Sequence, residues 1–262
     1  MTDVAELIEC QRDGFTLQAW LYHAPAVFEA ELAQIFRQHW LFVGHSCELP
    51  NRGDFLTWRI GGEALIVVRA DDGGIRALHN VCRHRGSLIC EREQGNAQRF
   101  VCPYHAWTYG LDGRLLNAPG ASGLDRSRLG LKSAHAEEVC GLIFINLADR
   151  AEPIEVLRAQ FEPILGPHRL ERAKVAKVVD YDLPVNWKTV TENNRECLHC
   201  PANHRLYVSV TYDVDSHDPG KQAEIEARLG ECRTRWAQMG LDVSRVNTSS
   251  DATASWFRAN RT

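Results

Sequence analysis

Apolar residues recur at helical spacing near the beginning of the chain. Phe28, Leu32, Ile35 and Phe36 follow a 3.6-residue period within Ala26–Trp40. This period places them on one face and predicts an amphipathic helix that packs on a core. The same pattern predicts two later helices, at Ile154–Leu165 and Lys221–Met239.

From about Trp40 to Leu147 the pattern changes to short β-type runs separated by glycines. The runs are Phe55–Ile60, Ala64–Arg69, Ile75–Val81 and Gly141–Leu147. Gly61-Gly62, and the DDGG at 71–74, are typical of hairpin turns. Residues 40–150 are therefore predicted to form a small antiparallel β domain.

The residues on either side of this block predict a mixed α and β region. A strand is predicted at Lys174–Tyr181, and a helix from Asn186 to about His199 that Pro201 ends. We expect an N-terminal helical segment at 1–39 to belong with residues 151–262. The expected fold class is α+β, with an antiparallel β domain in the middle.

Composition narrows the function classes. The 262 residues carry a net charge of −4, with 44% hydrophobic and 24% charged residues, which is ordinary for a globular protein. Without a basic stripe, nucleic-acid binding is not expected. Apolar runs such as Leu65–Val68 are too short to span a bilayer, and the acidic opening MTDVAELIEC does not resemble a signal peptide. We expect a cytoplasmic protein with no membrane partner.

Cysteines introduce the candidate chemistry. There are nine, an odd number, which argues against a complete disulfide framework and favours metal or redox chemistry. Most have no partner at ligand spacing and are interpreted as small buried hydrophobes. Four cysteines differ because a histidine follows or lies between them: Cys82, Cys102, Cys197 and Cys200.

The β block contains two Cys-His pairs at a spacing that suits a metal cluster. Cys82-Arg83-His84 is followed 17 residues later by Cys102-Pro103-Tyr104-His105. Zinc accepts two thiolates and two imidazoles, but zinc loops usually pair Cys with Cys and His with His. One Cys and one His on each loop is what a Rieske 2Fe–2S cluster needs, because the cysteines hold one iron and the histidines the other. We also expect Gly86 and Gly110 to let backbone amides approach the sulfurs, and Trp107 to shield the cluster.

A second candidate metal site follows Asn186. On a helix Glu192, Glu196 and His199 share one face. The chain can turn at Pro201 and bring His204 beside His199. Two histidines and a nearby carboxylate make a plausible mononuclear ferrous site with open positions for oxygen.

These two motif sets together resemble the catalytic (alpha) subunit of Rieske non-haem iron oxygenases. The resemblance rests on CRHRG, CPYHAWTYGLDGRL and NWKTVTENNRECLHCPANH. It implies a Rieske domain at 40–150, with Cys82, His84, Cys102 and His105 as cluster ligands. It also implies a helix-grip-like catalytic domain in which His199 and His204 hold Fe(II). Glu196 then occupies the position of the carboxylate that links His105 of a neighbouring subunit to His199 of its own chain.

The resemblance carries further expectations about partners and substrate. It implies a homotrimer, a separate reductase or ferredoxin as electron donor, and O₂ with a small organic substrate. The form ENNRECxHC resembles members that oxidise quaternary ammonium compounds. A cationic substrate favours aromatic faces, although core packing is the commoner role of aromatic residues. The candidates are Tyr207, Tyr212, Trp236 and Trp256. Aromatic-ring hydroxylation is the alternative.

Three alternatives concern the second site and the activity. Cys197, His199, Cys200 and His204 could form a zinc knuckle, although one short loop rarely wraps four ligands around a tetrahedral ion. Glu192 is expected to cap or pack, and Asn193 is a candidate for a hydrogen bond near the iron. In the resembling family the third iron ligand is an acid well downstream, and no acid after His204 stands in that context. We therefore expect a C-terminally shortened catalytic domain, with an inactive electron-transfer remnant as the other interpretation.

Overall fold

The computed structural model describes residues 4–12, 14–195, 199–210, 220–240 and 243. Its contacts divide the chain into two compact units, and each is described by itself. The first unit is formed by residues 1–27 and 182–262, and the second by Phe28–Tyr181. Within the part of the chain that the structure describes, no helix is both long and apolar enough to cross a membrane.

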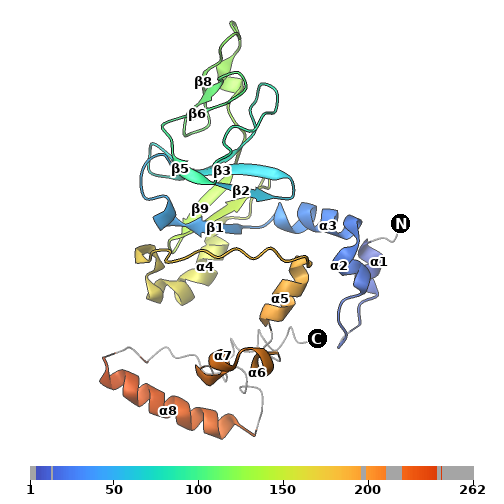
Figure 1. The fold of residues 1–262 in the computed structure, drawn as a ribbon, viewed down its shortest axis with the longest axis vertical. Helices are drawn as coiled ribbons and strands as arrows, with labels where there is room; N and C mark the ends of the chain where they lie inside the picture. The colour runs from blue at the N-terminus through green and yellow to red at the C-terminus, as the bar shows by residue number, and fades with distance from the viewer. Residues whose placement is uncertain (1–3, 13, 196–198, 211–219, 241–242, 244–262) are drawn as a thin grey trace. The chain divides into compact units, whose positions relative to one another are not determined.

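The Phe28–Tyr181 unit is built on two antiparallel sheets (Figure 1). The larger sheet has the order β1-β10-β9-β4-β3-β2-β5, and the smaller has the order β6-β7-β8. Strands of the larger sheet are β1 (Leu41–His45), β2 (Asp54–Ile60), β3 (Glu63–Arg69), β4 (Ile75–His79), β5 (Gln94–Asn96), β9 (Ser133–Val139) and β10 (Leu142–Asn146). The smaller sheet contains β6 (Phe100–Val101), β7 (Thr108–Tyr109) and β8 (Leu115–Asn117).

The hairpin predictions are confirmed. Strands β2 and β3 pair from Phe55↔Val68 to Ile60↔Glu63, and β3 pairs with β4 from Leu65↔His79 to Arg69↔Ile75. Alternate residues of β3 contribute to different clusters: Ile66 and Val68 to one, Leu65 and Val67 to the other. This strand is buried on both faces, which explains its continuous apolar run. The α+β fold class is also confirmed, since antiparallel sheets form the basis of one unit and the described elements of the other are helices.

The helical predictions are confirmed in part. Helix α4 (Ile154–Leu165) and helix α8 (Gln222–Gln238) lie where they were predicted. The N-terminal pattern becomes α3 (Pro25–Glu31) followed by a π-helical turn at Leu32–Phe36. Phe28 is 44% exposed and Ile35 is 38% exposed, whereas Leu32 is buried. The π turn shifts the apolar face at Ile35, so this expected core residue is partly exposed. Phe28 lies before the turn, in α3, and is exposed there.

Two predictions near the second candidate site were wrong in detail. Residues 174–181 do not form a strand, and Val178 and Tyr181 are 64% and 79% exposed. No described strand forms a ladder with this segment, and a strand needs a hydrogen-bonded partner. Pro201 lies in the first turn of α6 (Cys200–Asn203) rather than ending α5 (Trp187–Arg195), because a proline at that position loses no helical hydrogen bond.

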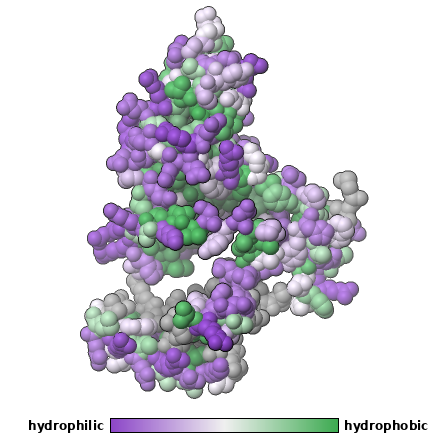
Figure 2. Space-filling model, viewed as in Figure 1, coloured by the Kyte–Doolittle hydropathy of each residue, from purple (hydrophilic) through white to green (hydrophobic). Residues whose placement is uncertain are grey.

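The remaining helices belong to the other unit. They are α1 (Val4–Glu9), α2 (Ala19–His23) and α7 (Arg205–Val210). Leu7, Leu21 and Val27 are buried together and form a small core around α1 and α2. Hydrophobic and hydrophilic residues are intermixed over the visible surface of both units (Figure 2).

Candidate metal centres

Two loops of the Phe28–Tyr181 unit have the same backbone hydrogen-bond pattern. In the first, the Cys82 amide donates to the Ser87 carbonyl at 2.8 Å, and the Gly86 amide donates to the Cys82 carbonyl at 3.0 Å. In the second, the Cys102 amide donates to the Trp107 carbonyl at 2.8 Å, and the Ala106 amide donates to the Cys102 carbonyl at 3.0 Å. Each cysteine therefore begins a six-residue loop of the same geometry.

The residue four positions after each cysteine adopts a left-handed conformation. Gly86 has φ 75° and Ala106 has φ 57°. Glycine takes this conformation without a steric penalty, whereas alanine is strained by it. The loop geometry is therefore maintained at Ala106 despite a local energetic cost.

Asn80 fixes the far end of the first loop. Its side chain is 1% exposed and donates from Nδ2 to the Cys90 carbonyl at 2.6 Å. Oδ1 accepts from the amides of Ile89 at 3.1 Å and Cys90 at 2.8 Å. Asn80 was not among the predicted site residues, because the predicted strand ran to Val81 whereas β4 ends at His79. An asparagine just after a strand often satisfies loop backbone groups.

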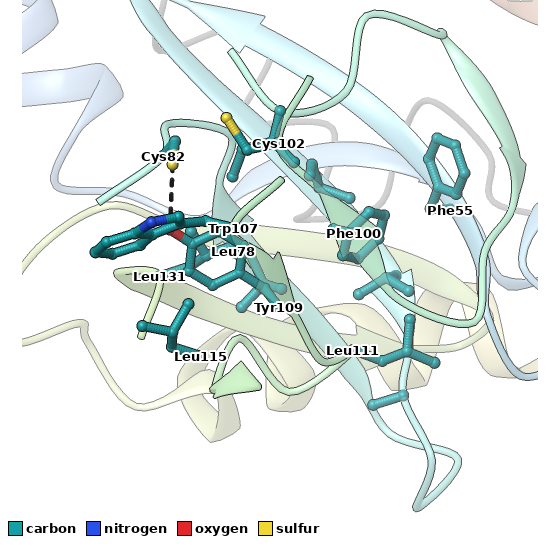
Figure 3. Packing of buried hydrophobic residues seen from close by; sticks show 14 of the residues in the cluster. Phe55, Leu78, Cys82, Phe100, Cys102, Trp107, Tyr109, Leu111, Leu115 and Leu131 are labelled. Carbon is teal, nitrogen blue, oxygen red and sulfur yellow. Dashed lines mark hydrogen bonds between the residues drawn. The ribbon is translucent and has the colours of Figure 1, made fainter. Parts of the chain in front are cut away.

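The two cysteines are buried and the two histidines lie nearer the surface. Cys82 and Cys102 are 3% and 2% exposed and belong to the core cluster drawn in Figure 3. The rings of His84 and His105 have centroids 4.6 Å apart. His84 also stacks on Trp107 at 4.8 Å. Trp107 is buried, and its indole stacks on one candidate ligand; that it shields a cluster stays a prediction.

Hydrogen bonds favour a thiolate at Cys102. Burial alone raises the pKa of this thiol, but backbone amides of Tyr104 and His105 and the side chains of Cys82 and Ser87 outweigh that effect and lower it. The amides of the two glycines have other acceptors: the Gly86 amide donates to the Cys82 carbonyl and the Gly110 amide to the Arg114 carbonyl at 2.9 Å. That these glycines allow other amides to approach the sulfurs stays a prediction. Amides of the second loop itself reach the sulfur.

Burial and nearby positive charges affect the pKa of His105 at the exposed end of the two loops. Burial, with the positive charges of His84 and Arg85, lowers the pKa of the His105 imidazole. The Arg85 guanidinium lies 5.6 Å from the Tyr104 ring centroid, and Tyr104 packs against His105 at 3.8 Å. A neutral imidazole is the form that binds a metal.

The donor set of the two loops fits a two-iron cluster. The donors come as a buried cysteine pair and an outer histidine pair. Two thiolates on one iron and two imidazoles on the other are the ligands of a Rieske centre.

The second candidate site lies around α6. His199 precedes this one-turn helix and His204 follows it. The His204 amide donates to the Cys200 carbonyl at 2.8 Å, and the Asn203 amide donates to the His199 carbonyl at 3.1 Å. The turn brings the two imidazole centroids to 5.3 Å. The return of the chain at this turn places the histidines side by side, as expected.

An open hollow of about 780 Å³ adjoins these histidines. Asn193 and Tyr207 line it, whereas Trp236 does not. Glu196, Tyr212 and Trp256 lie outside the described residues. Among the described residues, no carboxylate joins His199 and His204 in a group of three.

Two known protein families match regions of the chain that contain these two sites. Residues 39–129 match the Rieske [2Fe-2S] domain, so the chain contains a Rieske domain. Residues 170–261 match the catalytic domain of ring-hydroxylating alpha subunits. Together the two matches place the chain in the family of Rieske-type ring-hydroxylating alpha subunits. The first domain implies a 2Fe–2S cluster and the second a mononuclear iron.

Individual relatives agree with this assignment. The chain is 39% identical to a glycine betaine monooxygenase oxygenase subunit of Chromohalobacter salexigens, over 89% of this chain and 53% of that protein. It is 35% identical to a biphenyl 2,3-dioxygenase subunit alpha of Rhodococcus jostii, over 72% of this chain and 43% of that protein. The crystal structure of the quaternary ammonium Rieske monooxygenase CntA with L-carnitine superposes with a TM-score of 0.69 at 32% identity, covering 73% of this chain and 56% of that one. The chain thus spans about half the length of these relatives.

Proposed function

We propose that this chain acts within a terminal oxygenase that passes electrons from a Rieske cluster to a mononuclear iron. The observation that carries the proposal is the presence, in one chain, of the paired Cys-His loops and of the adjacent histidines around α6. Cys82, His84, Cys102 and His105 hold the cluster, and His199 and His204 hold Fe(II). When bound, the cluster stores one electron and the ferrous ion activates O₂.

The protein's own residues position these groups. The buried cysteine loops keep water from the thiolates, and the outer histidines give the electron a route to the surface. The role proposed for Glu196, which lies outside the described residues, is to link His199 of its own chain to His105 of a neighbouring copy, as the family resemblance implies. This arrangement requires an assembly of several copies, which we propose is a homotrimer. Residues 40–150 form the cluster domain, and residues 1–39 and 151–262 belong to the iron domain.

Quaternary ammonium compounds are the proposed substrates. Identity of 39% to a glycine betaine monooxygenase subunit supports them. Tyr207 lines the hollow beside the histidines, where its ring can face a cation. Aromatic-ring hydroxylation is the second candidate, supported by the 35% identity to a biphenyl dioxygenase subunit.

A reductase or ferredoxin supplies the electrons. We propose a cytoplasmic location, in line with the unpaired Cys82 and Cys102 of the two loops.

The test supplies the purified chain with Fe(II), O₂, a chemical reductant and one candidate substrate at a time. Formation of a tertiary amine together with an aldehyde from glycine betaine or carnitine supports the proposed class, and diol formation from biphenyl supports the second candidate. His199→Ala is the control, because it removes an iron ligand and leaves the cluster loops intact. Equal product from the parent and from this variant would contradict the role of the α6 histidines.

A further inference from the structure

Tyr22 contacts the helix before the candidate iron site at two places. Its phenolic hydroxyl donates to Glu192 of α5, at 2.8 Å to Oε1 and 3.0 Å to Oε2. Its backbone carbonyl accepts from Asn186 Nδ2 at 2.7 Å. Asn186 directly precedes α5 and Glu192 lies in its second turn. One residue of α2 therefore holds both the beginning and the middle of α5.

Asn186 also caps α5. Its Oδ1 accepts from the Lys188 amide at 2.9 Å, and its carbonyl accepts from the Thr189 amide at 3.0 Å. An asparagine at this position satisfies amides that have no partner within the helix. The Tyr22 carbonyl binds the other end of the same side chain, so the cap is fixed in its rotamer.

Helix α5 depends on these hydrogen bonds from Tyr22 and Asn186 more than α2 does. It has nine residues, Trp187–Arg195, none of which is buried. A helix of this length is only marginally stable by itself, and apolar burial normally sets the position of such a helix. Helix α2 is better anchored, because Leu21 is 6% exposed and packs with Leu7 and Val27. Tyr22 therefore connects a packed helix to an exposed one.

Lys188 adds cation–π contacts to Tyr22 and to Trp187. The Lys188 Nζ is 5.9 Å from the Tyr22 ring centroid and 5.3 Å from the Trp187 ring centroid. Burial, followed by the hydrogen bond and the charge of Glu192, raises the pKa of Tyr22. The phenol remains protonated as a donor over the working pH range.

We propose that Tyr22 is a positioning residue for the iron-histidine site, acting through Asn186 and Glu192 on α5. Helix α5 ends at Arg195 and His199 follows four residues later. A connection of four residues keeps His199 within about 14 Å of the end of α5, so the placement of α5 limits where the histidine turn can lie. The part that concerns iron rests on the proposed function, whereas the contact between Tyr22 and α5 does not.

The first test measures amide hydrogen exchange in α5 of the full chain without added iron. Tyr22→Phe removes only the hydroxyl, and we expect about fivefold faster exchange in α5, since Glu192 is exposed and its bond is weakened by solvent. Glu192→Leu should match it, and the double variant should add little. Glu192→Gln retains an acceptor oxygen and should behave as the parent. Tyr181→Phe is the matched control, because Tyr181 is 79% exposed and lies in the other unit.

The second test titrates the same variants with Fe(II) alone and records the electron paramagnetic resonance spectrum of the nitric oxide adduct. We expect Tyr22→Phe to bind Fe(II) about fivefold more weakly with a changed spectrum. The cluster content of Tyr22→Phe should stay at the parent level, and Glu192→Gln should keep the Fe(II) affinity and the spectrum of the parent. Unchanged α5 exchange in Tyr22→Phe, or additive effects in the double variant, would overturn the proposal. If the parent itself binds no Fe(II), the proposed function and the iron part of the inference fail, while the exchange data decide the α5 contact.

Discussion

The Tyr109 hydroxyl lies 3.3 Å from the Cys82 sulfur and accepts a hydrogen bond from the Arg83 amide at 3.1 Å (Figure 3). Because its oxygen accepts from the amide, its hydrogen is available to the sulfur. Burial, and then the hydrogen bond to Cys82, raises the pKa of Tyr109. The phenol therefore stays protonated beside a ligand that must be a thiolate.

Tyr109→Phe should lower the reduction potential of the cluster. A hydrogen bond to a ligand sulfur favours the reduced form, which carries more negative charge. Loss of about 1 kcal/mol of this preference corresponds to roughly 40 mV for a one-electron couple. Redox titration followed by circular dichroism measures the change, with Tyr181→Phe as the control. An unchanged or higher potential would show that the hydroxyl does not act on the reduced cluster.

Gly86→Ala should destabilise the first loop through backbone strain alone. A Cβ at Gly86 meets no atom within 4 Å, but φ is 75°. The expected cost is about 1 kcal/mol in the free energy of unfolding. Gly166→Ala is the matched control, since its Cβ also meets open space while φ is −54°. Denaturant unfolding measures the free energy of unfolding of both variants. Equal values for Gly86→Ala and Gly166→Ala would exclude backbone strain at Gly86 as a cause of destabilisation.

Ala106→Gly should have the opposite effect at the equivalent position of the second loop. Ala106 has φ 57°, so glycine relieves strain there while adding freedom to the unfolded chain. The net change should be a stabilisation of about 0.5 kcal/mol or less, in contrast to the loss at Gly86. A clear destabilisation by Ala106→Gly would mean that the two loops are not equivalent in energy.

Asn80→Ala should loosen the first cluster loop. Three buried backbone groups lose their partner, at a cost of about 3 kcal/mol in the free energy of unfolding. Asn80→Asp should be nearly as damaging, because a carboxylate cannot donate to the Cys90 carbonyl 2.6 Å away. Unfolding curves and retained acid-labile sulfide measure both effects. Full stability of Asn80→Asp would contradict the donor role of Nδ2.

The local pattern of apolar residues and glycines was sufficient to predict much of the β domain. Alternating or continuous apolar runs and glycine pairs located β2, β3 and β4, and the spacing of Cys82 to His105 predicted two matching loops. The hydrogen bond of Tyr22 to Glu192 had no such signal, because it joins residues 170 positions apart. The segment at 174–181 has strand-like composition, but composition does not supply a hydrogen-bonded neighbour. Ile35 was misplaced because a π turn cannot be seen in a 3.6-residue period.

The most direct test of the account measures iron, zinc and acid-labile sulfide in the anaerobically purified chain, followed by electron paramagnetic resonance after reduction with dithionite. If the paired loops hold a Rieske cluster, we expect two sulfides for each chain, iron in excess of zinc, and a Rieske-type signal that is lost in Cys82→Ser. His199→Ala should keep that signal. Stoichiometric zinc without sulfide, or a signal that survives Cys82→Ser unchanged, would contradict the assignment of the paired loops as the cluster site.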